Sequence, residues 1–231
     1  MNYTKIVKEE INKYEETELI NSNQLFLNKL SEIPEFTYYK ILERMVKNNE
    51  LARISKGLYV IPKQTEFGLI SNSEEKILSL YLENNNGLYK GLYLFNHLGL
   101  TTQLPKIIEI YSSKLDQETK RINNFKIQKI NMKLDMENTQ YIELLEVLEN
   151  YYKIEDINHN KFISYLKKSI NSYNDINLKY VLKNKKYKKS TIAFLETILN
   201  KYGIKNTLKM YLNRTSKYKI PDIEISYEPT Q

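Results

Sequence analysis

Apolar residues in the first fifty positions recur at the three- and four-residue spacing of amphipathic helices. In the most regular segment, Tyr39, Leu42 and Val46 form an apolar stripe, with Tyr38 and Met45 beside it. Pro34 suits the first turn of this helix, because proline lacks an amide hydrogen that a helix start leaves unbonded. The pattern predicts three helices, over residues 4–15, over residues 23–30 with Ser22 as the N-cap, and from Pro34 to about residue 48.

Two short alternating segments follow the third helix. Leu51–Ile54 and Leu58–Ile61 are separated only by Ser55-Lys56-Gly57, and the glycine can adopt the positive φ that a tight turn requires. Pro62 lacks an amide donor and ends the second strand. This order of elements predicts that residues 1–63 form a winged helix-turn-helix domain, in which two helices, a turn and a third helix are followed by the hairpin as the wing.

Polar residues on the third helix have the types that DNA recognition requires. Thr37, Lys40, Arg44 and Lys47 are spaced three, four and three residues apart, opposite the apolar stripe. Arginine pairs bidentately with guanine, threonine contacts bases or thymine methyl groups, and lysine suits phosphates. Arg53 and Lys56 on the wing can contact phosphates or a narrow minor groove. The candidate DNA-binding residues are Thr37, Tyr38, Lys40, Arg44, Lys47, Arg53, Ser55 and Lys56. The alternative is an ordinary solvated helix face.

The chain after residue 63 changes from helix to a mixture of helix and strand. A domain boundary is expected between Pro62 and Phe67. Ser71 and Glu74 have capping-box spacing at the start of a helix that runs to about residue 84. Further elements are expected as a helix over 90–98 that ends at Gly99, a β-branched strand after Pro105, and a strand within 124–134.

Residues 136–219 are helical by pattern. The segment 138–152 places Tyr141, Leu144, Leu145 and Leu148 on one face and predicts an acidic ridge of Glu143, Glu146 and Glu149. Further helices are expected over 160–171, over 191–202 with Gly203 after it, and around 204–213, with a lysine-dense loop over 182–190 and a polar tail over 220–231. The predicted class is therefore α+β and mainly helical, with the winged helix followed by a larger α+β domain over 67–219. That domain is mixed over 67–135, where it has a small sheet, and helical over 136–219.

Charge is distributed unevenly along the chain. Residues 161–219 contain 15 Lys and Arg against 2 Asp and Glu, a net charge of +13, whereas the whole chain carries +7. Such asymmetry indicates a polyanionic or acidic partner. The candidate polyanion-binding side chains in this region are Lys183, Lys185, Lys186, Lys188 and Lys189. A solvated loop, enriched in lysine by the composition of the chain, is the alternative.

Several classes of function lack their residues in this chain. There is no cysteine, and the two histidines, His97 and His159, have no spaced partner for a metal. Phosphate-loop, zinc-protease and serine-hydrolase motifs are missing, and the Glu118-Thr119-Lys120 segment lacks the aspartate that a metal-dependent nuclease needs upstream. We therefore expect no enzyme activity, no cofactor and no metal. No apolar run approaches the ~18 residues of a membrane span, and the N-terminus lacks the apolar segment of a signal peptide, so a cytoplasmic protein is expected.

The segments LARISKGLYVIP, GLYLFNHLGLTTQLP and IIEIYSS resemble the AbiEi family of abortive-infection antitoxins. The resemblance covers about residues 1–135, and the run from Gly99 to Pro105 is its most specific part. It implies an antitoxin that represses its own operon. From the polar stripe of the third helix and the adjoining wing, we expect the protein to bind its own promoter DNA at inverted repeats. The resemblance also implies that the protein counters a nucleotidyltransferase toxin, with the toxin or its RNA target as a partner. The alternative is a winged-helix protein-interaction module, or a general transcription regulator without a toxin. The Gly99–Pro105 run itself reads as scaffold.

Overall fold

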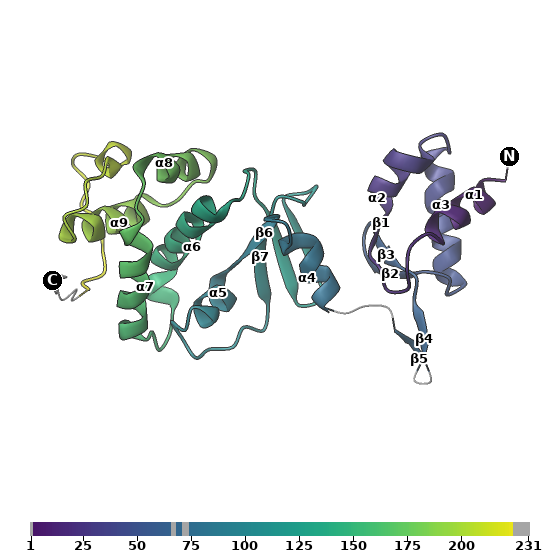
Figure 1. The fold of residues 1–231 in the computed structure, drawn as a ribbon, viewed down its shortest axis with the longest axis horizontal. Helices are drawn as coiled ribbons and strands as arrows, with labels where there is room; N and C mark the ends of the chain where they lie inside the picture. The colour runs from purple at the N-terminus through teal and green to yellow at the C-terminus, as the bar shows by residue number, and fades with distance from the viewer. Residues whose placement is uncertain (1, 66–67, 71–73, 224–231) are drawn as a thin grey trace. The chain divides into compact units, whose positions relative to one another are not determined.

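The computed structural model describes residues 2–65, 68–70 and 74–223. The fold is α+β, and its described part contains nine α-helices together with strands in three hydrogen-bonded groups. The chain divides into two compact units, Met1–Leu80 and Tyr81–Gln231 (Figure 1). Phe67, at the end of the expected domain boundary, lies outside the described residues. Ser71 of the expected capping box and most of the expected polar tail also lie outside them.

The first unit begins with helices and continues into a β-hairpin. Its elements are α1 (Tyr3–Ile11), β1 (Ile20–Asn21), α2 (Ser22–Leu25), a π-helical turn (Phe26–Leu30), α3 (Glu35–Lys47), β2 (Ala52–Ser55), β3 (Leu58–Val60), β4 (Lys63–Thr65), β5 (Gly68–Ile70) and α4 (Glu74–Leu82), which continues into the second unit. The expected second helix is thus an α-helical turn followed by a π-helical one. Its N-cap is Asn21, whose side chain accepts from the amides of Asn23 and Gln24, so the expectation of Ser22 as the cap was wrong.

Strands β1, β3 and β2 form an antiparallel sheet in that order. The hairpin turn contains Lys56 and Gly57, and Gly57 has φ +78°, which explains the glycine. The Ser22 amide donates to the Gly57 carbonyl at 3.0 Å, so the turn is attached to the start of α2. The predicted hairpin is confirmed, and its position is fixed by the helices.

The core of the first unit is built around α3. Tyr38, Ile41, Leu42 and Met45 are its buried residues. They pack against apolar residues from the other elements of the unit, namely Val7, Ile11, Ile20, Leu25, Leu30, Ile33, Leu51 and Tyr59. The buried face is therefore centred on Tyr38 and Ile41, whereas the predicted stripe included Tyr39 and Val46, which are only half-buried.

The second unit contains a four-stranded sheet in the order β6-β7-β9-β8. Its strands are β6 (Gly87–Lys90), β7 (Ile108–Ser112), β8 (Thr119–Ile122) and β9 (Phe125–Lys129). Strand β7 pairs with β9 in parallel, and the two outer pairings are antiparallel. Strands β7 and β9 confirm two expectations, but β6 and β8 had not been predicted. Gly87 is required at the start of β6, because an added Cβ would lie 2.3 Å from the Tyr81 carbonyl oxygen.

Helices make up the rest of the second unit. They are α5 (Gly91–His97), α6 (Met136–Asn150), α7 (His159–Asn171), α8 (Asp175–Asn184) and α9 (Lys189–Lys201), with 3-10 turns at Tyr151–Lys153 and Leu208–Tyr211. Gly99 and Gly203 have φ +70° and +68° and follow α5 and α9, as expected for helix ends. The last expected helix is only a 3-10 turn. None of the described helices has the length and apolar character needed to cross a membrane.

Helix α6 is the centre of the second core. It packs against α5, α7, α8, α9 and β6. Because helices surround it, Glu146 is only 7% exposed, and the predicted ridge of three exposed glutamates was wrong. The Gly99–Pro105 segment also belongs to the scaffold. The Thr101 hydroxyl donates to the Glu155 carbonyl at 2.9 Å, and the Asn158 amide donates to the Leu100 carbonyl at 2.8 Å.

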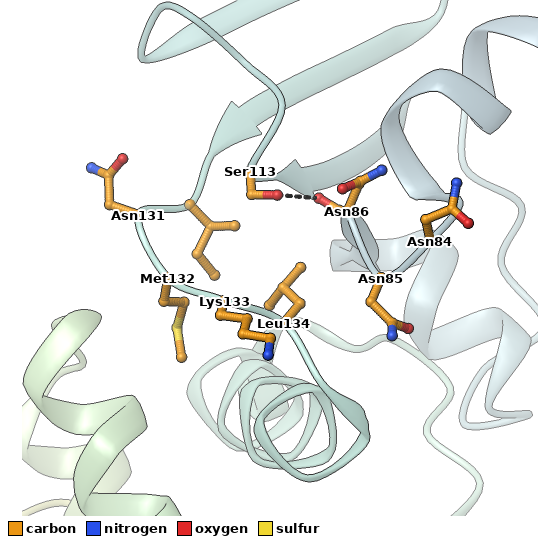
Figure 2. Close-up of a pocket in the computed structure, with 9 residues that line it drawn as sticks. Asn84, Asn85, Asn86, Ser113, Asn131, Met132, Lys133 and Leu134 are labelled. Carbon is orange, nitrogen blue, oxygen red and sulfur yellow. Dashed lines mark hydrogen bonds between the residues drawn. The ribbon is translucent and has the colours of Figure 1, made fainter.

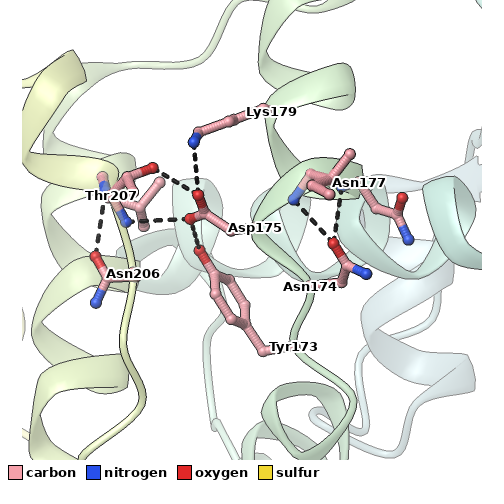
Figure 3. A network of polar contacts seen from close by, with 9 residues as sticks. Tyr173, Asn174, Asp175, Asn177, Lys179, Asn206 and Thr207 are labelled. Atoms are coloured by element: carbon pink, nitrogen blue, oxygen red, sulfur yellow. Dashed lines mark hydrogen bonds and ion pairs between the residues drawn. The ribbon is translucent and has the colours of Figure 1, made fainter.

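Asp175 joins the start of α8 to the segment before the last 3-10 turn (Figure 3). Its carboxylate accepts from the Tyr173 hydroxyl at 2.7 Å and from the Thr207 hydroxyl at 2.7 Å, and it pairs with Lys179 at 2.7 Å. Burial alone would raise the pKa of Asp175, but the hydrogen bonds from Lys179, Thr207 and Tyr173 hold that pKa well below its usual range. The network therefore depends on an ionised carboxylate.

Candidate nucleic-acid interface

The outward face of α3 carries the predicted cations. Lys40, Arg44 and Lys47 are exposed, and Thr37 is half-buried at the edge of this face. They are held there because the opposite side of the helix is fixed in the core. The helix begins after Pro34, and Arg44 and Lys47 lie in its last turn, where positive charge complements the helix dipole.

Tyr38 does not belong to this face. Its side chain is 0% exposed, and its hydroxyl donates to the Ser22 carbonyl at 3.0 Å. Its ring lies 5.2 Å from that of Phe26, centroid to centroid. Burial raises the pKa of the Tyr38 hydroxyl well above its usual range. Tyr38 is thus a core residue, and its inclusion among the DNA-binding candidates was wrong.

Two residues on the same face had been missed. Phe36 is 76% exposed in the first turn of α3, and the Lys40 ammonium lies 5.7 Å from the centroid of its ring. Glu43 is exposed and pairs with Lys40 at 2.8 Å, and the hydrogen bond from Lys40 lowers the pKa of Glu43. Phe36, Lys40, Glu43 and Lys47 are spaced four, three and four residues apart. This helical spacing could have predicted that Phe36 and Glu43 lie on the same face as the lysines. A prediction based only on cationic residues omits both.

The hairpin extends the charged surface of α3. Arg53 is exposed on β2, opposite Tyr59 of β3. The positive charge of Arg53 contributes to the lowered pKa of Glu43, after the contributions of Lys40 and Lys47. Tyr59 packs in the same core cluster as the buried residues of α3, so the hairpin that carries Arg53 is attached to that helix. Lys56 is exposed in the turn beside Gly57.

Ser55 lies differently from the prediction. Its hydroxyl oxygen is buried. Within the described part of the chain, the hydroxyl neither donates nor accepts a hydrogen bond. The strand register shifts between Arg53 and Ser55, which directs successive side chains away from simple alternation. Ser55 therefore does not present its hydroxyl to a ligand. The remaining candidate surface consists of Phe36, Thr37, Lys40, Glu43, Arg44, Lys47, Arg53 and Lys56.

The predicted lysine loop of the second unit is divided among different elements. Lys183 lies in α8 and Lys189 begins α9, so the loop itself is much shorter than residues 182–190. Lys188 pairs with Glu149 at 3.7 Å, and the Lys189 ammonium donates to the Asn213 side chain at 2.5 Å. Lys183 and Lys186 are exposed. The five lysines therefore do not lie on one continuous loop.

Lys185 is half-buried and lies against two aromatic rings of the second unit. Its ammonium lies 4.9 Å from the centroid of the Tyr111 ring and 3.9 Å from that of Tyr187. The Lys90 ammonium lies 4.5 Å from the Tyr111 ring, and the Tyr111 hydroxyl donates to buried Glu146 at 3.3 Å. Burial lowers the pKa of Lys185, although the Glu146 carboxylate acts in the opposite direction. The side chain therefore stabilises packing between aromatic rings.

A pocket of about 470 Å³, with both polar and apolar side chains in its lining, lies elsewhere in the second unit (Figure 2). It is lined by Asn84, Asn85, Asn86, Ser113, Ile130, Asn131, Met132, Lys133 and Leu134. The Ser113 hydroxyl donates to the Asn86 carbonyl at 3.1 Å. Amides offer neutral donors and acceptors, and the only titratable group among these lining residues is the Lys133 amine. The pocket therefore lacks the paired acid and base of a hydrolytic site.

Comparisons with known proteins place the chain in a family. Within the described residues, no group of three or more His, Cys, Asp and Glu side chains is arranged to hold a metal ion. None of the curated proteins compared with the chain matches it. The sequence model of one family, described as a family of unknown function (DUF6088), matches residues 8–172, from α1 to the end of α7. The match spans more than half of the chain, and the protein therefore belongs to the DUF6088 family.

Proposed function

We propose that the first unit is a winged helix that binds double-stranded DNA, with α3 in the major groove and the β2–β3 hairpin as the wing. The observation that carries the proposal is the shared surface of α3 and the hairpin. Lys40, Arg44 and Lys47 are exposed on α3. Arg53 is exposed on the hairpin, opposite Tyr59, and Tyr59 packs in the same core cluster as the buried face of that helix. A groove-binding helix needs this arrangement, in which one face is fixed in a core and the other offers donors to bases and phosphates.

The residues of this surface have different roles in the proposal. Arg44 donates two hydrogen bonds to a guanine, and Glu43 accepts from a cytosine amino group. Lys47, Arg53 and Lys56 contact phosphates and fix the register of the domain on the duplex. Lys40 contributes less to DNA binding, because its ammonium already pairs with the Glu43 carboxylate at 2.8 Å.

In the cell, this DNA binding serves autorepression in an antitoxin. The support is the resemblance of the wing and of the Gly99–Pro105 run to AbiEi antitoxins. In this proposal the protein binds inverted repeats in its own promoter and counters a nucleotidyltransferase toxin encoded beside it. The second unit, with the basic region 161–219, is the part that acts against the toxin or its RNA target.

Binding to promoter DNA is the direct test. Fluorescence anisotropy with a labelled duplex from the upstream region should give much tighter binding than with a shuffled duplex of equal length. The phosphate contacts of Lys47, Arg53 and Lys56 would give a slope of about −2.7 for each bound domain in a plot of log affinity against log salt concentration. Equal affinity for the two duplexes at physiological salt would overturn the proposal. For the antitoxin role, co-expression with the neighbouring nucleotidyltransferase should restore growth that the toxin alone prevents.

A protein-interaction module is the second candidate, and Phe36 is the observation that favours it. An exposed aromatic ring beside an ion pair is also typical of the centre of a protein interface. The salt dependence of the affinity distinguishes DNA binding from protein binding. Affinity for DNA falls steeply with salt concentration because counterions are displaced from the phosphates, whereas the affinity of an apolar contact is nearly insensitive to salt. A partner that binds α3 with a flat salt response, together with absent DNA binding, would favour this second function.

A further inference from the structure

Phe36 is an aromatic side chain that the first unit does not use for its own packing. It is 76% exposed, although the rest of the helix around it is firmly anchored by Tyr38 and Ile41. The Lys40 ammonium, one turn later, lies 5.7 Å from the ring centroid. The ring therefore lies on a surface that otherwise consists mainly of charged groups. It is at the N-terminal end of α3.

The chemistry of a phenyl ring limits what it can recognise. The ring has no conventional hydrogen-bond donor or acceptor, so it cannot replace lysine at a phosphate or arginine at a guanine. The 5-methyl group of thymine is the apolar group that base pairs present in the major groove. Residues near the N-terminus of a recognition helix commonly contact base edges there. Position, exposure and chemistry therefore agree on one ligand.

We infer that Phe36 is a specificity-determining residue that reads a thymine through its 5-methyl group. The inference rests on the proposed DNA binding and names the base that α3 selects. Lys40 keeps the ring in place through its contact with the ring face, while Glu43 holds Lys40 from the next turn. Phe36, Lys40 and Glu43 thus form one line of contacts along the outward face.

Removal of single methyl groups tests this inference. The full-length protein first selects its preferred duplex from a random pool, and each thymine of that duplex is then replaced in turn by deoxyuridine, which lacks only the methyl group. One thymine in each half-site should show about fourfold weaker binding on replacement, as expected for one buried methyl group. The Phe36→Ala variant should bind more weakly and should bind the thymine and uracil duplexes equally.

Tyr152 provides a matched control. It is also an exposed aromatic residue, at 64%, with the Lys219 ammonium 5.9 Å from its ring centroid, but it lies in the second unit. Tyr152→Ala should retain both the wild-type affinity and the uracil effect. Circular dichroism checks the fold of both variants, and low salt keeps weak binding measurable.

The outcomes separate the inference from the function on which it rests. If the wild type selects a duplex but no thymine is sensitive to uracil, Phe36 does not read a methyl group, although DNA binding stands. The same holds if Phe36→Ala keeps the full uracil effect, or binds as tightly as the wild type. If the wild type selects no duplex at all, the proposed function and this inference are both overturned.

Discussion

Arg44 and Lys56 differ in the DNA groups that their side chains are suited to contact. Arg44 lies in the last turn of α3, on its exposed side, and in the proposed complex its guanidinium contacts a base edge. Its planar fork matches the two acceptors of guanine, so its contribution depends on sequence. Lys56 lies in the hairpin turn and carries a point charge, which suits a phosphate and carries no sequence information.

Replacement of each residue by alanine should therefore have a different effect. Arg44→Ala should cost about 1–3 kcal/mol of binding free energy and reduce discrimination between promoter and shuffled DNA. Lys56→Ala should weaken binding to both duplexes equally and reduce the salt slope by about 1. Anisotropy titrations at several salt concentrations measure both quantities. Unchanged specificity in Arg44→Ala would mean that α3 does not read bases in the proposed way.

At the scale of elements, the turn between α8 and α9 contains two adjacent lysines in different environments. Lys185 packs on the rings of Tyr111 and Tyr187, whereas Lys186 is exposed. Lys185→Gln should lower the free energy of unfolding by about 1–2 kcal/mol, because two cation–π contacts near a buried carboxylate are lost. Lys186→Gln should change that free energy by no more than about 0.5 kcal/mol. Urea denaturation of the two variants makes the comparison, and equal stabilities would show that the ring contacts of Lys185 do not stabilise the fold.

The Asp175 network should give the second unit a measurable dependence on pH. Because the pKa of Asp175 is lower in the folded state, its contribution is complete above the unfolded value near 3.8 and is lost as the pH falls through the folded value. Asp175→Asn should lower the free energy of unfolding by about 1–3 kcal/mol at pH 7. This difference from the wild type should shrink below about pH 4. Denaturation curves at pH 7 and pH 3 test it, and a difference that grows toward pH 3 would contradict the assigned sign.

Elements with strong periodicity could be predicted, whereas elements defined by their neighbours could not. Helix α3 and the β2–β3 hairpin follow from apolar spacing and from Gly57 in its turn. Strand β8 (Thr119–Ile122) is short and largely polar, and only its pairing with β9 makes it a strand. The acidic side chain of Glu146 predicts an exposed helix position, but in the structure it is buried and accepts a hydrogen bond from Tyr111 of β7. Phe36 shows the reverse, because its apolar type predicts burial and the structure exposes it.

At the scale of the whole molecule, the two proposed activities belong to different units. The α3 and hairpin surface lies within Met1–Leu80, whereas most of the basic region 161–219 has no match to the family model, which ends at residue 172. The exposed lysines Lys183 and Lys186 belong to that region. In the proposed function, these lysines act on the toxin or its RNA target, whereas the surface of α3 and the hairpin reads promoter DNA.

Paired variants of the full-length chain should separate repression from neutralisation of the toxin. Arg44→Ala combined with Lys47→Ala should abolish promoter repression, because a base contact and a phosphate contact are both lost, and should leave rescue from the co-expressed toxin intact. Lys183→Gln combined with Lys186→Gln should weaken rescue and leave repression intact, because both side chains are exposed and their loss leaves the fold unchanged. A promoter reporter and a growth assay measure the two activities in the same cells. Full rescue by the Lys183 and Lys186 variant would show that these lysines are solvated surface, and loss of both activities in either variant would show that the units act together.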